Sequence, residues 1–212
     1  MILDISKAAR EICLKAPIIP VLVVENAADA VPLAKALIAG GLPVLEVTLR
    51  TDAALDVIRE MATCDGAIVG AGTLLSPEDF DAAKAAGAQF AVSPGITDNL
   101  IDAAKRTKLP LLPGASTASE VMSLLEAGLD MLKFFPAEAN GGVSALKSLA
   151  SPLPAASFCP TGGVNTANVK DYLALPNVVC AGGSWMAPKA LIDKGDWAAI
   201  EALARDAKAL AM

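Results

Sequence analysis

One pattern recurs along the whole chain: an alanine-rich helical stretch, then a glycine, then a short β-rich run. The β-rich runs lie at residues 18–24, 43–49, 67–72, 88–93, 109–113, 130–135, 156–159 and 177–181. Helical stretches near residues 27–39 and 52–62 separate the first three runs. Another helix is indicated by Ser76-Pro-Glu-Asp79, which supplies an N-cap residue, an N1 proline and an acidic first turn. Alternating strands and helices favour parallel βαβ units, and eight such units predict an α/β fold, the (β/α)8 TIM barrel.

The domain organisation follows from the uniformity of this pattern. No linker, low-complexity stretch or charge block interrupts the 212 residues, so we expect a single barrel domain over residues 1–212. An additional segment precedes the first strand. Its apolar residues follow helical spacing, and they are Ile5, Ala8, Ala9, Ile12, Cys13 and Ala16. This spacing predicts an extra N-terminal helix that packs across one end of the barrel.

Composition excludes several classes of function. Apolar residues make up 54% of the chain, but no run approaches the ~20 residues that span a bilayer. The N-terminus lacks the basic start and apolar block of a signal peptide, so we expect a cytoplasmic protein without a membrane partner. The cysteines are single, as expected of reduced core thiols, and they are Cys13, Cys64, Cys159 and Cys180. A net charge of −6 without a basic patch argues against nucleic acid as a partner.

A glycine register places two charged residues opposite each other. The glycines that suit the left-handed C′ position of three helices are Gly41, Gly87 and Gly128. Five residues after each glycine lie equivalent positions on the second, fourth and sixth strands, and these are Glu46, Val92 and Lys133. Inward residues of alternate barrel strands share a layer. We therefore expect Glu46 and Lys133 to project from opposite walls into one cavity.

Lys133 lies near the end of an apolar run in a chain that contains no histidine. Burying an ammonium without a partner is costly, and a lysine that loses its proton becomes a nucleophile. Strand alternation puts Thr48 and Arg50 on the face of Glu46, and Phe135 on the face of Lys133. A carboxylate, a guanidinium and an amine then converge near the C-terminal mouth, which favours amine chemistry on a carbonyl. A purely structural ion network is the alternative interpretation.

Glycine pairs follow the last two predicted strands. Cys159-Pro-Thr-Gly-Gly163 precedes a helix expected from about Asn165, and Ala181-Gly-Gly-Ser184 follows the eighth strand. The loops after strands seven and eight form the usual phosphate site of a barrel, because exposed amides there bind anions. Thr73, after the third strand, can donate a hydrogen bond to a carboxylate or a carbonyl. Without histidine or clustered carboxylates, we expect neither a metal site nor another cofactor.

The motifs together resemble the class I aldolases of the KDPG/KHG family. The matching blocks run in order through nearly the whole chain, and they are Leu45-Glu-Val-Thr-Leu-Arg-Thr51, Val69-Gly-Ala-Gly-Thr73, Val92-Ser-Pro-Gly95, Lys133-Phe-Phe-Pro-Ala-Glu-Ala-Asn-Gly-Gly142, Phe158-Cys-Pro-Thr-Gly-Gly163 and Gly182-Gly-Ser-Trp185. The resemblance implies a (β/α)8 barrel, a homotrimer, a lysine Schiff base and no metal. It also implies cleavage of 2-dehydro-3-deoxy-6-phosphogluconate to pyruvate and glyceraldehyde 3-phosphate, a step of the Entner–Doudoroff pathway.

The same resemblance implies a role for each matching residue. Lys133 would form the Schiff base, Glu46 would be the general acid and base, and Arg50 and Thr73 would hold the pyruvyl carboxylate. Three residues would border the aldehyde side and influence stereochemistry, and they are Thr161, Phe135 and Pro94. The phosphate would be held by Gly162, Gly163, Gly183 and Ser184. Cleavage of 4-hydroxy-2-oxoglutarate to pyruvate and glyoxylate is a related possibility.

Two other functions fit the same pattern. A metal-free phosphosugar isomerase or epimerase would share the phosphate loops but would need no covalent lysine. A non-catalytic protein that binds phosphorylated metabolites would tolerate the loss of Glu46 or Lys133. The common element of all three interpretations is a small phosphorylated ligand.

Overall fold

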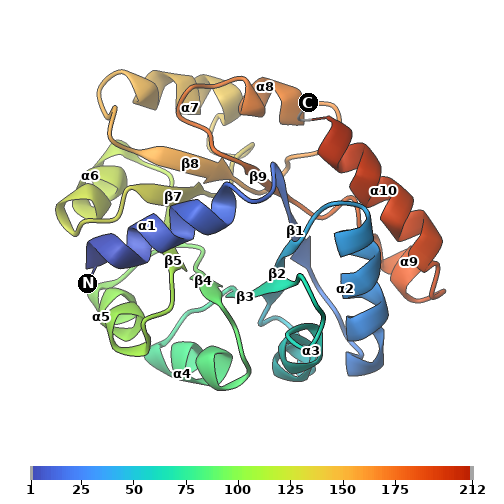
Figure 1. The fold of residues 1–212 in the computed structure, drawn as a ribbon. Coiled ribbons are helices and arrows are strands. Elements are labelled where there is room, and N and C mark those ends of the chain that lie inside the picture. The colour runs from blue at the N-terminus through green and yellow to red at the C-terminus, as the bar shows by residue number, and fades with distance from the viewer. Residues whose placement is uncertain (1, 211–212) are drawn as a thin grey trace.

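The computed structural model describes residues 2–210; the predicted domain also includes Met1, Ala211 and Met212, which lie outside the described residues. Strands occupy the centre of the molecule and helices surround them (Figure 1). The strands are β1 Ile18–Leu22, β2 Val44–Thr48, β3 Ile68–Gly72, β4 Phe90–Val92, β5 Leu111–Leu112, β6 Gly114–Ala115, β7 Met131–Phe134, β8 Ser157–Pro160 and β9 Ala181–Gly183. The fold is therefore α/β, as predicted.

Most of the helices connect successive strands, whereas α1 precedes the first strand and α9 and α10 follow the last. The helices are α1 Ile2–Cys13, the 3-10 helix η1 Ala27–Asp29, α2 Ala30–Ala39, α3 Ala54–Met61, α4 Pro77–Ala85, α5 Asp98–Thr107, α6 Ala118–Glu126, α7 Gly142–Ala150, α8 Val169–Leu173, α9 Lys189–Ile192 and α10 Trp197–Ala209. No helix among residues 2–210 is both long and apolar enough to cross a membrane. The four cysteines are free and buried, as expected.

The strands form a curled parallel sheet. One part has the order β5-β4-β3-β2-β1-β9 and the other the order β6-β7-β8. Each strand pairing in both parts is parallel. Pro113 alone separates β5 from β6, because a proline cannot donate to the ladder. Isolated parallel bridges join Phe158 in β8 to Val178, and Thr161, which follows β8, to Gly182 in β9.

The helix boundaries confirm several of the residues predicted to start or end a helix. Ser76 caps α4 in a capping box: its hydroxyl accepts a hydrogen bond from the amide of Asp79, whose carboxylate accepts one from the amide of Ser76. The three register glycines have positive φ values of 89°, 95° and 85°, at Gly41, Gly87 and Gly128 respectively. The left-handed backbone at these positions ends each helix and starts the next strand in the same register.

Several predicted boundaries are wrong. The eighth strand, expected at 177–181, is β9 and shares only Ala181 with that range. The residues before it follow a turn, in which the amide of Val178 bonds to Leu175, and they make a single bridge, from Val178 to Phe158. The strand expected at 109–113 is split at Pro113 into β5 and β6. The helix expected from Asn165 begins at Val169. The helix expected over 27–39 does occupy that range, as the 3-10 helix η1 followed directly by α2.

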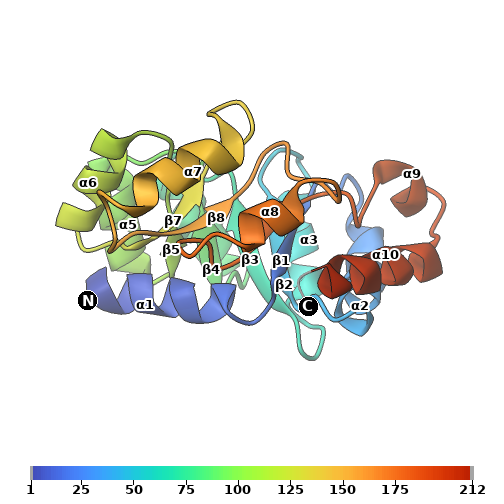
Figure 2. The same cartoon turned by 90° about the horizontal axis from the view of Figure 1, so that it is seen from above.

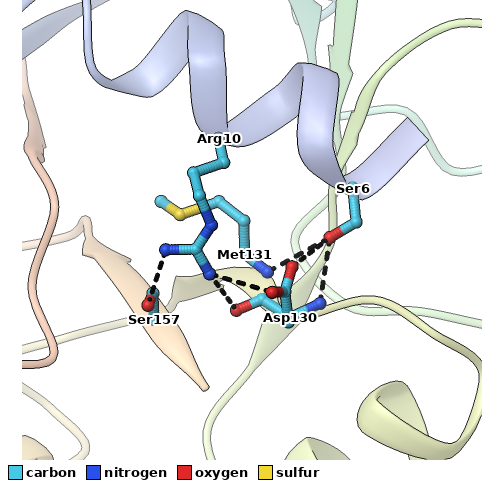
Figure 3. A network of polar contacts seen from close by, with 5 residues as sticks. All are labelled: Ser6, Arg10, Asp130, Met131 and Ser157. Carbon is cyan, nitrogen blue, oxygen red and sulfur yellow. Dashed lines mark hydrogen bonds and ion pairs between the residues drawn. The ribbon is translucent and has the colours of Figure 1, made fainter. Parts of the chain in front are cut away.

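The predicted N-terminal helix is present, and α1 lies across one end of the sheet, over the starts of β7 and β8 (Figures 1 and 2). A polar network attaches it there (Figure 3). The Ser6 hydroxyl donates to the Asp130 carboxylate at 2.6 Å and accepts from the amide of Asp130 at 3.0 Å. Arg10 donates to Asp130 at 3.0 Å and to the Ser157 hydroxyl at 2.9 Å. This network closes the end of the strands opposite the predicted mouth.

The Asp130 network makes the stability of the protein depend on pH. Partial burial tends to raise the pKa of Asp130, but the hydrogen bond from Ser6 and the charge of Arg10 outweigh it and hold the pKa below its ordinary value of 3.8. A carboxylate whose pKa is lower in the folded than in the unfolded protein stabilises the fold at pH values above the unfolded-state pKa. This stabilisation is lost as the pH falls through the folded-state pKa. Asp130→Asn should lower the melting temperature by about 2–4 °C at pH 7. The difference from wild type should shrink as the pH falls below 4, measured by thermal unfolding monitored by circular dichroism.

Asp102→Asn is the matched control, because Asp102 is an exposed partner of Lys105 on α5. Exposed ion pairs contribute little to stability, so this variant should melt within about 1 °C of wild type at pH 7. A stability difference for Asp130→Asn that stays constant as the pH is lowered from 7 to 2.5 would contradict the role of the charge.

Candidate active site

The site is built around an ion pair between β2 and β7. Lys133 Nζ lies 3.3 Å from Glu46 Oε1, and the two side chains are 6% and 3% exposed. Glu46 pairs with Val21 on β1 and Gly70 on β3, which fixes its register. The convergence predicted from the glycine register is confirmed. The Lys133 ammonium is therefore buried with a carboxylate partner.

A glycine makes this buried pair possible. A Cβ atom at Gly72 would lie 2.3 Å from Glu46 Oε1, well inside contact distance. Only a residue without a side chain leaves room for the Glu46 carboxylate beside β3. On the other side, the Lys133 ammonium lies 5.0 Å from the centroid of the Phe135 ring. The carboxylate and the amine are thus held in contact by β3 and by the ring of Phe135.

Arg50 and Thr73 lie at the mouth beside this pair. Arg50 is exposed, and its Nε donates to the Thr48 hydroxyl at 3.1 Å. Thr73 follows β3 with a φ of 64°, which is unusual for a β-branched residue and is a strained backbone conformation. Strained backbone conformations of this kind cluster at active sites and ligand clamps.

An inner cavity of about 160 Å³ contains the pair. Its lining residues are Val21, Glu46, Thr48, Arg50, Thr73, Pro94, Lys133, Phe135 and Thr161. An outer cavity of about 190 Å³ adjoins it. Its lining residues are Val21, Arg50, Phe135, Thr161, Gly162, Gly163, Val164, Gly182, Gly183 and Ser184. Every site residue predicted from the sequence lines one of these two cavities or both.

The outer cavity has the features of an anion site. Gly162 and Gly163 have φ values of 97° and 81°, which only glycine adopts readily. Among residues 2–210, neither their amides nor that of Ser184 donates a hydrogen bond. The carbonyl of Gly163 is occupied, because Asn165 and Asn168 donate to it. Unpaired amides around a concave surface are suited to phosphate oxygens.

Two details of the phosphate prediction are wrong. Because α8 starts at Val169, the amides of Gly162 and Gly163 belong to a loop and not to the first turn of a helix. Gly183, expected in a loop after the eighth strand, is the last residue of β9. The donors available to an anion in the outer cavity are therefore loop amides, the Ser184 hydroxyl and the Arg50 guanidinium.

The sequence analysis assigned no site role to several supporting residues. Gly182 leaves room for Thr161, since a Cβ there would lie 2.3 Å from Thr161 Oγ1. The Tyr172 hydroxyl donates to Glu138, whose amide donates to the carbonyl of Gly162 at 3.0 Å. Burial raises the pKa of Tyr172, and the bond to Glu138 adds to this effect, so the phenol stays protonated. Through Glu138, this contact links α8 to the loop that contains Gly162 and Gly163.

The arrangement can perform covalent chemistry on a carbonyl compound. A carboxylate in contact with an amine can take its proton and return it to a substrate oxygen. The amine faces a cavity, and a guanidinium that can bind a carboxylate lies at the same cavity wall. Among the described residues, no three His, Cys, Asp or Glu side chains are grouped to hold a metal ion.

Comparisons with known proteins agree with this geometry. The family model described as KDPG and KHG aldolase matches residues 9–203. The KHG/KDPG aldolase of Escherichia coli K12 is 52% identical over 201 residues, which cover 94% of each chain. The 2-keto-3-deoxy-6-phosphogluconate aldolase of Zymomonas mobilis ZM4, solved with 3-phosphoglycerate, has a TM-score of 0.91 and 49% identity, covering 99% of this chain and 97% of that one.

A second solved structure is the KDPG aldolase of Legionella pneumophila, with pyruvate captured at low pH as a covalent carbinolamine intermediate. It has a TM-score of 0.92 and 43% identity, and it covers 94% of this chain and 98% of that one. The family match spans most of the sequence, and the relatives match it nearly end to end. The chain belongs to the KDPG and KHG aldolase family.

Proposed function

We propose that this protein is a class I aldolase that cleaves 2-dehydro-3-deoxy-6-phosphogluconate to pyruvate and glyceraldehyde 3-phosphate. The observation that carries the proposal is the buried contact of 3.3 Å between Lys133 Nζ and Glu46 Oε1, beside a cavity. The carbinolamine with pyruvate in the Legionella relative supports a covalent lysine mechanism. The site needs no metal or other cofactor, because the iminium formed on Lys133 accepts the electron pair.

The first half of the mechanism forms the iminium. Glu46 takes a proton from the Lys133 ammonium, and the neutral amine attacks the C2 ketone of the substrate. Glu46 returns the proton to the developing oxyanion and then takes one proton from the attacking nitrogen, which gives a neutral carbinolamine. It then protonates the hydroxyl of the carbinolamine, and water leaves with formation of the iminium. A single carboxylate within hydrogen-bond reach of the amine can serve each of these transfers.

The second half of the mechanism breaks the C3–C4 bond and releases the two products. Glu46 removes the C4 hydroxyl proton through a bridging water, and the C3–C4 bond breaks as its electron pair moves into the iminium to give an enamine. The aldehyde leaves with its phosphate. Glu46 then protonates the enamine at C3, and hydrolysis of the new iminium frees pyruvate and regenerates the Lys133 amine.

The other cavity residues bind and orient the substrate. Arg50 and Thr73 hold the pyruvyl carboxylate, and a guanidinium provides two parallel hydrogen bonds that a lysine cannot reproduce. Thr161, Phe135 and Pro94 border the aldehyde side and influence its stereochemistry. This assignment is supported by the position of Thr161 and Phe135 in the lining of both cavities.

The phosphate occupies the outer cavity in this proposal. The residues that bind it are Gly162, Gly163, Gly183 and Ser184. The unpaired amides of the glycine loop support the assignment, as does 3-phosphoglycerate in the structure of the Zymomonas relative. The activity would belong to carbohydrate metabolism, in the Entner–Doudoroff pathway.

Cleavage of 4-hydroxy-2-oxoglutarate is a second candidate function of the same site. The inner cavity contains the whole set of groups for the covalent chemistry, and the Escherichia coli relative is named a KHG/KDPG aldolase. This substrate has no phosphate to occupy the outer cavity. We expect it to be cleaved with a lower kcat/KM than the phosphorylated one.

The larger organisation is also part of the proposal. We propose that the chain is one domain whose strands close into a (β/α)8 barrel. Bridges join β8 and Thr161, which follows it, to β9 and the residue Val178 before it. They support closure, because β9 pairs with β1 and because β5 and β6 act as one strand.

A homotrimer is proposed on the family resemblance. A cytoplasmic location is supported by four free thiols, which persist in a reducing compartment.

Trapping with pyruvate tests the proposed function. Incubation with pyruvate followed by borohydride should give a reduced adduct, and peptide mass mapping should locate it at Lys133. The same preparation should release pyruvate from 2-dehydro-3-deoxy-6-phosphogluconate at a rate that a chelator does not change. Absence of an adduct, or an adduct only at the exposed Lys147, would overturn the mechanism and leave an isomerase or a binding protein, which turnover assays distinguish.

A further inference from the structure

Arg50 occupies a position from which it can reach either end of a substrate. It lines both the inner and the outer cavity. Among residues 2–210, it is the only lysine or arginine in the lining of the outer cavity. Because Arg50 is exposed, the surrounding protein does not by itself fix the direction of its guanidinium. The cation therefore needs a fixed orientation if it is to bind a carboxylate in the inner cavity.

Thr48 supplies a fixed contact to Arg50 from inside the protein. Thr48 is the last residue of β2 and is only 2% exposed. Its hydroxyl donates to the carbonyl of Leu22 on β1 at 2.9 Å. The same oxygen accepts the hydrogen bond from Arg50 Nε at 3.1 Å. One side chain thus joins the backbone of β1 to the guanidinium at the mouth.

The direction of these hydrogen bonds is determined by chemistry. A carbonyl oxygen only accepts, so the single hydroxyl proton of Thr48 must point at Leu22. The lone pairs of the hydroxyl are then available to Arg50, which only donates. A valine in this place would have nearly the same shape but could make neither bond, whereas a serine could make both.

The contact at Nε leaves the binding end of Arg50 available. The two terminal nitrogens have no hydrogen-bond or ion-pair partner among residues 2–210. These nitrogens form the fork that matches a carboxylate in parallel hydrogen bonds. Holding Nε restricts the plane of the guanidinium while its fork remains free for a ligand.

We propose that Thr48 is a positioning residue for the aldolase reaction: it holds Arg50 so that the guanidinium binds the carboxylate of the 2-keto acid at the inner cavity. The inference rests on the proposed function, since it assigns Arg50 to that carboxylate. Thr48 acts through Arg50 and takes no part in the proton transfers of Glu46 or in the bond to Lys133.

The test compares Thr48→Val with Thr48→Ser. The measured quantity is the pyruvate concentration that gives half-maximal borohydride adduct at Lys133, together with kcat and KM for cleavage. Losing a hydrogen bond to a cation that is open to solvent corresponds to about fivefold in a binding constant. Thr48→Val should therefore raise the half-saturating pyruvate concentration and KM about fivefold, and kcat should change less than twofold. Thr48→Ser should remain within twofold of wild type.

Two controls separate this role from a general loss of packing. Methyl pyruvate carries no carboxylate charge, so its half-saturating concentration should be the same for wild type and Thr48→Val. In an Arg50→Lys background, which lacks Nε, Thr48→Val should add less than twofold to KM. Thermal melting reports the folded state of each variant, and Thr48→Ala, which is smaller, replaces Thr48→Val if valine prevents folding.

The outcomes are decisive in both directions. Unchanged pyruvate saturation in a folded Thr48→Val protein would overturn the inference, as would an equal loss with methyl pyruvate or an undiminished effect in the Arg50→Lys background. A wild-type protein that forms no adduct at Lys133 would instead refute the proposed function, so the two failures are distinguishable.

Discussion

Lys133→Met should abolish aldol cleavage and the pyruvate adduct together. Methionine retains the apolar part of the side chain but removes the amine that attacks the ketone. Loss of a covalent nucleophile typically costs about 10⁴-fold or more in kcat. Turnover measured as pyruvate release, and adduct formation measured by mass spectrometry after borohydride reduction, should both fall to the background level. Lys147→Met on α7, where the lysine is exposed, is the matched control and should behave as wild type.

Removing Lys133 also removes the ion-pair partner of a buried carboxylate. An unpaired buried charge destabilises a protein by about 3–5 kcal/mol, part of which is avoided if the carboxyl binds a proton. The double variant Lys133→Met/Glu46→Gln carries no buried charge at either position, so it should melt closer to wild type than Lys133→Met and remain inactive. If the single variant retained more than a tenth of the wild-type kcat, Lys133 would not be the nucleophile.

Glu46→Gln should lower kcat by about 10²–10⁴-fold, which is the usual contribution of one positioned acid–base group. Glutamine has nearly the same size and fits beside Gly72, so the loss should reflect proton transfer and not packing. Pyruvate affinity should change by less than about tenfold, because Arg50 and Thr73 bind the carboxylate in the proposed mechanism.

Exchange of the pyruvate methyl protons in deuterium oxide provides a direct readout of this residue. The wild-type enzyme should exchange them through the enamine, and nuclear magnetic resonance should detect much slower exchange in Glu46→Gln. Glu60→Gln, at an exposed position of α3, is the matched control and should exchange at the wild-type rate. Wild-type exchange in Glu46→Gln would remove Glu46 from the role of acid and base.

The glycine register explains why the centre of the site could be predicted from the sequence. A left-handed glycine ends a helix, and the following strand enters the sheet a constant number of residues later. Lys133 and Glu46 therefore hold equivalent places in β7 and β2, and their contact follows from counting along the chain. The prediction succeeded because it depended on local backbone geometry that repeats.

The last strand was harder to predict, because its pairing does not follow from local backbone geometry. The apolar residues from Val178 to Cys180 have the composition of a strand, but they make only one bridge, at Val178, and the strand that pairs with β1 consists of Ala181 and the glycines at 182 and 183. Glycine has a low strand propensity, so composition points away from these residues. Their pairing is determined by tertiary contacts, including the room that Gly182 leaves for Thr161.

The supporting contacts lie beyond what sequence patterns can indicate. Tyr172 on α8 reaches Glu138 in the turn after β7, and Arg10 reaches Asp130 across 120 residues of sequence. Neither pair has a characteristic spacing. Thr48 is an intermediate case, because strand alternation predicts its face correctly but not the acceptor on Leu22.

The two adjoining cavities divide the lining residues into three sets, and this division has a consequence for changing the specificity of the protein. Residues confined to the outer cavity, such as Gly163 and Ser184, can be altered without touching the lysine and its carboxylate. Residues confined to the inner cavity must be kept if pyruvate remains the donor. Thr161 and Phe135 border both cavities, so changes there affect donor and acceptor at once. A library that seeks new aldehyde acceptors should therefore begin at the outer cavity and leave the shared residues until last.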